Sequence, residues 1–320
     1  MLPGALAGAQ VAGLLFFLNP YLPFRAGPLA RAVVQYGLLL GAVSLAAQFP
    51  WTWGRPGRAR RLLPWGLTAA LAAAALLDWT HASYYAYYLP AGINRRLLKA
   101  ALWLTLAALV CFYTAFLHTL QRRPYGRRSR WFLGLVAVLS LYVMIERRES
   151  FRPRPEAPRW PPAVERGERP RLWVIGLDAA TLDALLPLAA QGRVPFLARL
   201  LEEGAYGRLA SFAPRRPAAL WTTLATGRHP AEHAVLGGVR YRARFLGPGR
   251  ELRLLPVGIG FARWGVRAAR GAPPGAGREA AALWEVLTRL GVVSGVVGWP
   301  AAGAAPGLTV RVVAGDAPAG

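Results

Sequence analysis

Charge is distributed very unevenly along this chain, and that distribution limits what its first half can become. Before Glu146 the only acidic residue is Asp78, and long windows there carry no charge at all. A membrane-spanning helix needs roughly 20 apolar residues, with about 17 as the lower limit. Three stretches meet that limit: Ala32–Phe49, Leu62–Thr80 and Ala100–Leu120. The sequence therefore predicts a membrane-embedded first half followed by a globular second half.

Two shorter apolar stretches, Gly4–Leu18 and Trp131–Ile145, extend this prediction to an α-helical membrane domain of about five spans. We place that domain at residues 1–146. Residues 147–170 are rich in Pro, Arg and Glu without an apolar period, which is typical of an extended linker. Residues 171–320 have ordinary globular chemistry and form the second predicted domain.

The distribution of arginine between the short loops predicts the orientation, because cytoplasmic loops carry the excess of basic residues. One set of loops holds nine arginines, at positions 55, 58, 60, 61, 122, 123, 127, 128 and 130. The other set holds five basic residues, at positions 25, 31, 95, 96 and 99. The first set is predicted to be cytoplasmic, so the second half of the chain is expected outside the cytoplasm. An aromatic cluster is expected at the outer interface: Trp79, Tyr84, Tyr85, Tyr87 and Tyr88.

The formal net charge of +24 suggests nucleic-acid binding, but the details argue against it. Lys99 is the only lysine, a bias that points to codon composition rather than to phosphate recognition. No zinc-finger spacing and no aromatic-basic RNA motif accompanies the charge, so no nucleic-acid partner is expected. Cys111 is the sole cysteine and lies within an apolar span, which excludes an internal disulfide framework and a cysteine-based zinc site.

Strand and helix patterns alternate in the second half of the chain. Leu172–Leu177 is a short apolar run that suits a strand buried on both faces, and "VVSGVVGW" is a second such run. Tyr206–Phe212 is a further candidate strand. Three helices are expected between them, at Pro195–Glu203, Pro217–Thr226 with Gly227 as its stop, and Arg278–Gly291. This order predicts an α/β domain with a doubly wound parallel sheet.

A single carboxylate, Asp178, follows the first predicted strand directly. Ligands of doubly wound folds gather outside the carboxyl ends of the strands, which is where this residue is expected. Two interpretations stay open on the residues alone. Asp178 is either the N-cap of the helix that follows or a carboxylate ligand of a hard or borderline metal ion.

The motifs of this half occur in a recognisable order. "VIGLDAATLDALLPLAAQGRVPFLARLLEEGAYGRLAS" is followed by "LWTTLATGRHPAEHAVLGG", "ALWEVLTRLGVVSGVVGWPA" and "GLTVRVVAGD". Together they resemble the N-terminal part of the type I phosphodiesterase/nucleotide pyrophosphatase family, within the alkaline phosphatase superfamily. The resemblance spans Trp173 to about Asp316 and implies part of an alkaline-phosphatase-type sheet. The first half of the chain shares nothing with that family core.

The resemblance also implies a chemistry. Family members hold two divalent metal ions, usually zinc, and Asp178 matches the Asp ligand at the end of their first strand. Their nucleophile is a Thr or Ser at the start of the helix before W-T-[ST]. That position falls here on Pro217, or on Arg216 after a shift of one residue, and neither bears a hydroxyl. The nearest hydroxyls belong to Ser211, Thr222 and Thr223.

The family's remaining Asp and His ligands would lie farther along than Gly320. The sequence is therefore expected to be a fragment, one half of a split enzyme completed by a second polypeptide, or a degenerate relative. "HPAEH", His229 to His233, matches a zinc-protease pattern whose histidines must share one helical face. Gly227 and Pro230 interrupt any such helix, so a metalloprotease is not expected.

The function predicted from the sequence is that of a membrane-tethered phosphodiesterase-like protein with little or no hydrolytic activity of its own. Zinc is the cofactor that the resemblance implies, and tight binding by this chain alone is not expected. The predicted location is the cell (inner) membrane, with several passes through the lipid bilayer and an extracytoplasmic second domain. The alternative is an integral membrane protein with a transport, scaffolding or partner-binding role.

Overall fold

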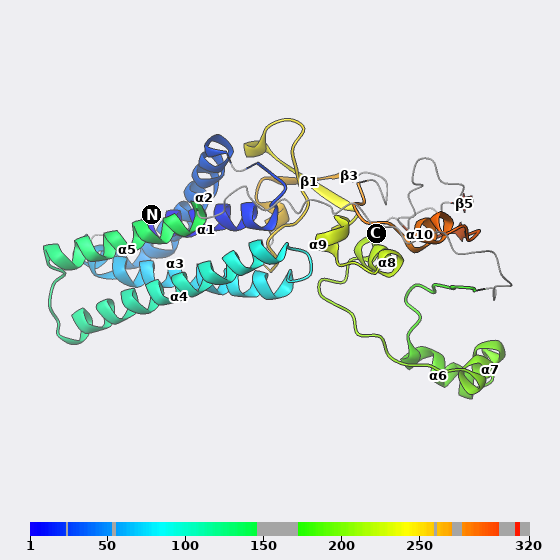
Figure 1. Cartoon of the computed structure of the whole chain (residues 1–320). Coiled ribbons are helices and arrows are strands. Elements are labelled where there is room, and N and C mark those ends of the chain that lie inside the picture. Colours follow the sequence, from blue (N-terminus) through cyan, green and yellow to red (C-terminus); the bar gives the residue numbers. More distant parts are fainter. Residues whose placement is uncertain are drawn as a thin grey trace.

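The computed structural model describes residues 1–23, 25–52, 56–145, 172–258, 261–270, 277–300 and 311–313. The predicted linker at 147–170 lies outside the described residues. Five helices gather at one end of the molecule, and the small sheets and short helices lie at the other (Figure 1). The helices are α1 (Leu2–Leu18), α2 (Ala26–Thr52), α3 (Pro56–Tyr84), α4 (Ala91–Leu120) and α5 (Arg127–Ile145).

All five predicted spans are helical, but they differ in length and apolar character. Three helical segments are long and apolar enough to cross a membrane: Ala26–Pro50, Arg61–Tyr84 and Ala91–Leu120. Helix α1 is apolar but shorter, with 17 residues, and α5 has arginines in its first turn. The prediction of about five spans is thus supported for three helices.

Helix α1 is the core of the helical region. Fourteen of its 17 residues are buried, and it contacts α2, α3 and α5. A helix that is hydrophobic all round is buried by its neighbours, which is what its sequence predicts. Its glycines let α2 come close: a Cβ atom on Gly4 would lie 2.1 Å from the Leu40 carbonyl oxygen, and one on Gly8 would lie 2.3 Å from that of Tyr36. The pair fits the G-x-x-x-G pattern of membrane helix contacts.

The second half of the chain contains five short helices, two 3₁₀ segments and five strands within the described residues. The helices are α6 (Leu182–Ala190), α7 (Pro195–Glu203), α8 (Pro217–Thr226), α9 (Pro230–His233) and α10 (Leu283–Arg289). Helix α7 matches its predicted bounds, and α8 begins at Pro217 and ends at Gly227 (φ 65°), as predicted. Helix α10 is shorter than predicted because the Glu285 carboxylate accepts a hydrogen bond from the Ala282 N–H and so defines its start.

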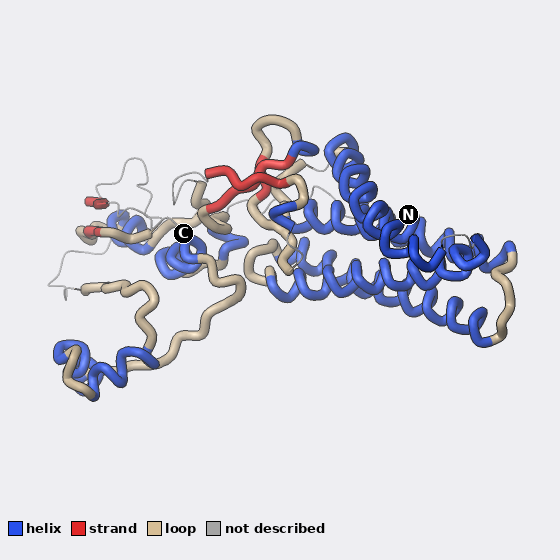
Figure 2. Tube along the Cα trace, turned by 180° about the vertical axis from the view of Figure 1, so that it is seen from behind, coloured by secondary structure: helices blue, strands red, loops and turns tan. Residues whose placement is uncertain are grey.

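Antiparallel pairing replaces most of the expected parallel sheet. Strands β1 (Val239–Ala243), β2 (Glu251–Leu252) and β3 (Val266–Arg270) form a sheet in the order β2-β1-β3. Figure 2 shows it between the helical region and the short helices. Only β4 (Gly295–Val297) and β5 (Arg311–Val313) pair in parallel, and β4 lies within the predicted "VVSGVVGW" strand. The described strands therefore show a small sheet region and not a doubly wound sheet.

Two predicted strands are wrong. Leu172–Leu177 and Tyr206–Phe212 form no strand, and Trp173 and Ile175 are 81% and 74% exposed. An apolar run becomes a buried strand only where neighbouring strands and helices cover it, and no described strand lies beside this one. The segment Leu172–Leu177 passes close to α8: a Cβ atom on Gly176 would lie 2.5 Å from the Trp221 ring.

The buried residues of the second half do not form one separate core. Phe245, Leu252, Phe261 and Val266 belong to a cluster that includes residues of α1 and α2. Ala219, Leu236 and Leu254 belong to another, built around the ends of α1, α3 and α4. Residues 212–258 and 261–266 therefore fold onto the ends of the helices, while α6 and α7 stand apart from the rest (Figure 1).

Candidate functional site

Asp178 is exposed and lies in a tight turn. Its Oδ1 accepts a hydrogen bond from the Ala179 N–H at 3.1 Å, and Ala179 adopts a left-handed φ of 58°. The N-cap interpretation of this carboxylate is wrong, because α6 starts at Leu182 with Thr181 as its N-cap. Two residues earlier, Gly176 contacts Trp221. The segment that carries Asp178 therefore passes close to α8, which begins at the predicted nucleophile position.

The described side chains around Asp178 do not fit a two-metal site. No group of three or more His, Cys, Asp or Glu side chains in the part of the chain that the structure describes is placed to hold a metal ion. The nearest acid along the chain, Asp183, is paired with Arg208. A bound zinc normally needs about four protein or water ligands, and paired metals need more. Asp178 by itself supplies one.

Helix α8 presents Arg216 and Pro217 where the resemblance implies a hydroxyl nucleophile. Arg216 is the N-cap residue of α8 and Pro217 is its first helical residue. The Arg216 guanidinium donates to the carbonyl oxygens of Leu236 (3.1 Å) and Arg253 (3.4 Å) and to the Tyr85 hydroxyl (3.3 Å). This arginine thus ties the start of α8 to the turn between α3 and α4.

Two buried tyrosines complete that junction. The Tyr85 hydroxyl donates to the Leu255 carbonyl oxygen (2.8 Å), and the Tyr88 hydroxyl donates to that of Pro214 (2.6 Å). The Arg216 guanidinium lies 5.7 Å and 5.8 Å from the centroids of their rings, within the range of a cation–π contact. Burial raises the pKa of each tyrosine to about 12, although the arginine opposes that shift. Both tyrosines stay neutral donors near pH 7.

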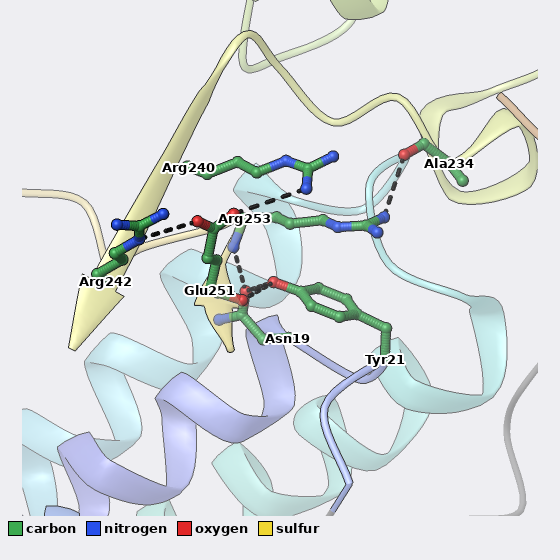
Figure 3. Close-up of polar contacts among 7 residues, drawn as sticks. All are labelled: Asn19, Tyr21, Ala234, Arg240, Arg242, Glu251 and Arg253. Atoms are coloured by element: carbon green, nitrogen blue, oxygen red, sulfur yellow. Dashed lines mark hydrogen bonds and ion pairs between the residues drawn. The ribbon is translucent and has the colours of Figure 1, made fainter. Parts of the chain in front are cut away.

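Backbone hydrogen bonds and buried leucine side chains together hold the segment Glu251–Val257. Asn19, at the end of α1, is fully buried. Its Oδ1 accepts hydrogen bonds from the N–H groups of Arg253 (2.8 Å) and Leu254 (3.0 Å). Its Nδ2 donates a hydrogen bond to the Leu254 carbonyl oxygen (2.8 Å). The Tyr21 hydroxyl shares its proton between Asn19 Oδ1 and the Glu251 carbonyl oxygen (Figure 3). The Val257 N–H donates to Nε2 of the buried His81 at 2.8 Å.

These contacts fix the second half of the chain on the helix ends. Glu251 also forms ion pairs with Arg240 (3.6 Å) and Arg242 (3.1 Å), which join β2 to β1 (Figure 3). Backbone contacts depend on position and not on side-chain identity, so the sequence does not predict them directly. The one sequence feature that indicates this contact is Asn19, a polar residue directly after an apolar helix.

Two of the candidate replacement hydroxyls, those of Thr222 and Thr223, are poorly placed for nucleophilic attack. Thr222 is buried and its hydroxyl donates to the Ala218 carbonyl oxygen at 2.7 Å. The Thr223 hydroxyl lies 3.1 Å from Nε2 of His233, which resembles a nucleophile and its base. However, Nδ1 of His233 accepts the Val235 N–H (3.1 Å), so in the neutral ring Nε2 carries the proton and donates to Thr223. A donor cannot take a proton from that hydroxyl.

Burial also keeps His233 neutral, and this makes the stability of the chain dependent on pH. Desolvation lowers the pKa of His233 to about 4. The unfolded histidine binds a proton near pH 6.5 and the folded one only near pH 4, so stability is complete above pH 6.5 and falls as the pH drops through that window. We expect a loss of about 2 kcal/mol between pH 7 and pH 4.5.

The measurement is the unfolding midpoint of the full chain in neutral detergent at the two pH values. His233→Asn should have a lower midpoint and a weaker pH dependence, because it removes the titrating ring. His229→Asn is the control, because it makes the same substitution at an exposed histidine. Equal pH dependence in both variants would assign the effect to other groups.

The two histidines of "HPAEH" point to different partners. His229 is the N-cap residue of the four-residue helix α9, and its ring packs at a tilt against that of Tyr87, with 4.7 Å between the centroids. His233 is buried against α8. They do not share one helical face, as a zinc-protease site requires.

Comparison with known families agrees with the order of motifs in this half of the chain. Residues 172–312 match the model of the family "Type I phosphodiesterase / nucleotide pyrophosphatase". This region is therefore similar to that family. No curated protein and no solved structure matches the chain. The phosphodiesterase-family region thus includes Asp178, the whole of α8, and the segment Glu251–Val257 that is docked on the helix ends.

Proposed function

We propose that this chain is a membrane-tethered, phosphodiesterase-like protein whose family region does not hydrolyse phosphoesters and is held on the ends of the membrane helices as a structural or binding module. The observation that carries the proposal is the start of α8. There, Pro217 replaces the expected hydroxyl, and Arg216 is bonded to Tyr85 and to backbone carbonyls. A residue tied in this way supports the docked arrangement.

The family metal site is part of the same proposal. By its place in the motif order, Asp178 matches one family ligand, and we propose that it alone does not retain zinc. In the family chemistry a hydroxyl attacks phosphorus while two metal ions stabilise the attacking and leaving oxygens. The described residues offer neither that hydroxyl at the start of α8 nor a second cluster of ligands. Neither the structure nor the comparisons identify a second polypeptide that would supply them.

Hydrolysis tests this proposal directly. The full chain in neutral detergent, supplied with Zn²⁺ and a chromogenic phosphodiester, should turn over substrate at the same rate as its Asp178→Ala variant. Pro217→Thr should not raise that rate, because one restored hydroxyl does not supply the missing ligands. Metal-dependent turnover that disappears in Asp178→Ala would refute the non-catalytic assignment and would make Thr223 the first hydroxyl to examine.

We further propose that the family region lies outside the cytoplasm, on the cell membrane. The loop between α4 and α5, with Arg122, Arg123, Arg127, Arg128 and Arg130 in and beside it, lies at the end of the helices away from the family region (Figure 1). Cytoplasmic loops carry such an excess of arginine. The family region contacts the opposite ends, at Asn19 and Tyr85.

Topology reporters test this orientation. An alkaline phosphatase fused after Gly320 should be active, because that enzyme folds only after export, whereas a cytoplasmic fluorescent reporter at the same place should stay dark. A fusion within the α4–α5 loop should give the reverse pattern and serves as the control. Fluorescence after Gly320 without phosphatase activity would place the family region in the cytoplasm.

A further inference from the structure

The two 3₁₀ segments of the family region, η1 (Arg244–Leu246) and η2 (Phe261–Arg263), lie along the first turns of α2. Arg31 Nε donates to the Phe245 carbonyl oxygen (3.1 Å), and Gln35 Nε2 donates to that of Trp264 (3.4 Å). Because Arg31 and Gln35 are four residues apart, they share one face of the helix. The ring of Tyr36 packs against those of Phe245 (5.8 Å) and Phe261 (5.1 Å). We call this contact region the α2 seam.

The length of α2 sets the level of the α2 seam relative to the bilayer. At 1.5 Å per residue, its 27 residues extend about 40 Å, while the hydrocarbon core is about 30 Å thick. About two turns therefore lie outside the hydrocarbon. The apolar stretch begins directly after Arg31, at Ala32, and Val34 and Leu38 are 58% and 64% exposed, as suits lipid-facing side chains. Arg31, and with it η1 and η2, thus lies at the headgroup level.

The α2 seam carries uncompensated positive charge at that level. Arg31, Arg244 and Arg263 are all exposed. Glu251 is the only acid between Val239 and Arg270, and its carboxylate is already shared by Arg240 and Arg242. Among the described residues, none of the three seam arginines has a carboxylate within ion-pair distance. The pairing Ala243↔Val266 brings the ends of η1 and η2 together, so Arg244 and Arg263 lie in adjoining segments.

We propose that Arg31, Arg244 and Arg263 bind the phosphate groups of anionic phospholipid headgroups in the leaflet beside the family region. The three guanidiniums meet a layer of fixed negative charge at their own level, and guanidinium groups bind phosphate through paired N–H donors. Trp264, half-buried against Phe261 (5.8 Å between ring centroids), flanks them as an interfacial aromatic residue. The inference depends on the membrane placement of α2 and is independent of whether the family region hydrolyses phosphoesters.

Lipid binding by the full chain in neutral-detergent micelles tests this inference. The probes are phosphatidylglycerol and phosphatidylcholine, each with a fluorophore on one acyl chain, and the readout is fluorescence anisotropy. Phosphatidylglycerol should bind at least tenfold more tightly than phosphatidylcholine, and 0.5 M NaCl should reduce the difference. The variant R31Q/R244Q/R263Q should bind phosphatidylglycerol about a hundredfold more weakly. Each arginine near a lipid surface contributes roughly a fivefold factor to the affinity, and three such factors multiply.

A matched variant removes the same charge elsewhere. R193Q/R199Q/R208Q changes three exposed arginines on and beside α6 and α7, which stand apart from the helices (Figure 1), and should bind phosphatidylglycerol like the parent chain. If the first triple variant does not fold, R244Q/R263Q replaces it, because it keeps the Arg31 hydrogen bond to Phe245; a loss of about twentyfold is then expected.

Three outcomes would overturn the inference. The first is equal affinity for the two lipids, and the second is an equal loss in both triple variants. The third is displacement of half of the bound phosphatidylglycerol by free glycerol 3-phosphate. That result would assign the arginines to a soluble phosphate compound and not to the membrane surface.

Discussion

Replacing Gly8 by leucine is expected to prevent the close packing of α1 on α2 and to destabilise the helical region by 3 kcal/mol or more. A Cβ atom at this position would lie 2.3 Å from the Tyr36 carbonyl oxygen and 2.5 Å from the Gly37 nitrogen. The obstacle is backbone, which cannot turn aside as a side chain does, so the helices must separate. Inserted atoms in a packed interior typically cost about 1–3 kcal/mol even where side chains can adjust.

The measurement is the midpoint of unfolding by added SDS in mixed micelles, together with the yield of monodisperse protein. Gly134→Leu is the control: it makes the same change in α5, where no atom of the described residues lies within 4 Å of the added Cβ. A graded pair sharpens the test. Gly8→Ala should be strongly destabilising, whereas Gly37→Ala should be mild, because its Cβ would lie 3.6 Å from the Ala5 carbonyl oxygen. Equal effects of the two alanines would contradict the close approach.

Asn19→Ala is expected to loosen the docking of the family region, at a cost of about 4 kcal/mol. The change leaves two buried N–H donors, those of Arg253 and Leu254, and one carbonyl oxygen, that of Leu254, without their partner. A buried polar group that loses its partner costs roughly 1–3 kcal/mol. The segment Glu251–Val257 should therefore open more often, and with it the three-stranded sheet.

Trypsin detects this opening, because the strands of the sheet carry arginines at positions 240, 242, 267 and 270, and Arg253 directly follows β2. If cleavage follows the open population, 4 kcal/mol corresponds to an acceleration of several hundredfold, since each 1.4 kcal/mol is a factor of ten. Asn94→Ala is the matched control, because the buried Asn94 Oδ1 makes no hydrogen bond to any residue that the structure describes. Cleavage of the sheet at the parental rate in Asn19→Ala would show that other contacts, such as those of Tyr85, are sufficient for docking.

Local signals in the sequence were enough to place most of the helices. The long apolar stretches predicted α2, α3 and α4, and Pro217 with Gly227 predicted both ends of α8. The family resemblance rested on the same kind of information, an ordered set of motifs, and the family match over residues 172–312 confirms it. Gly4 and Gly8 form a G-x-x-x-G pattern in an apolar helix, which is a sequence signal for the α1–α2 contact.

Burial and partnership were decided only by the tertiary structure. Leu172–Leu177 has the composition of a buried strand but remains exposed, because the atoms that would cover it must come from elsewhere in the chain. Tyr85 and Tyr88 were expected at the lipid interface and are instead buried beneath the family region, bonded to Leu255 and Pro214. Propensity and periodicity depend on neighbours in sequence, whereas these outcomes depend on contacts between residues more than 100 positions apart. The sequence determined most of the helices and the resemblance to the family, and the structure determined that residues 212–258 and 261–266 are built onto the ends of the N-terminal helices.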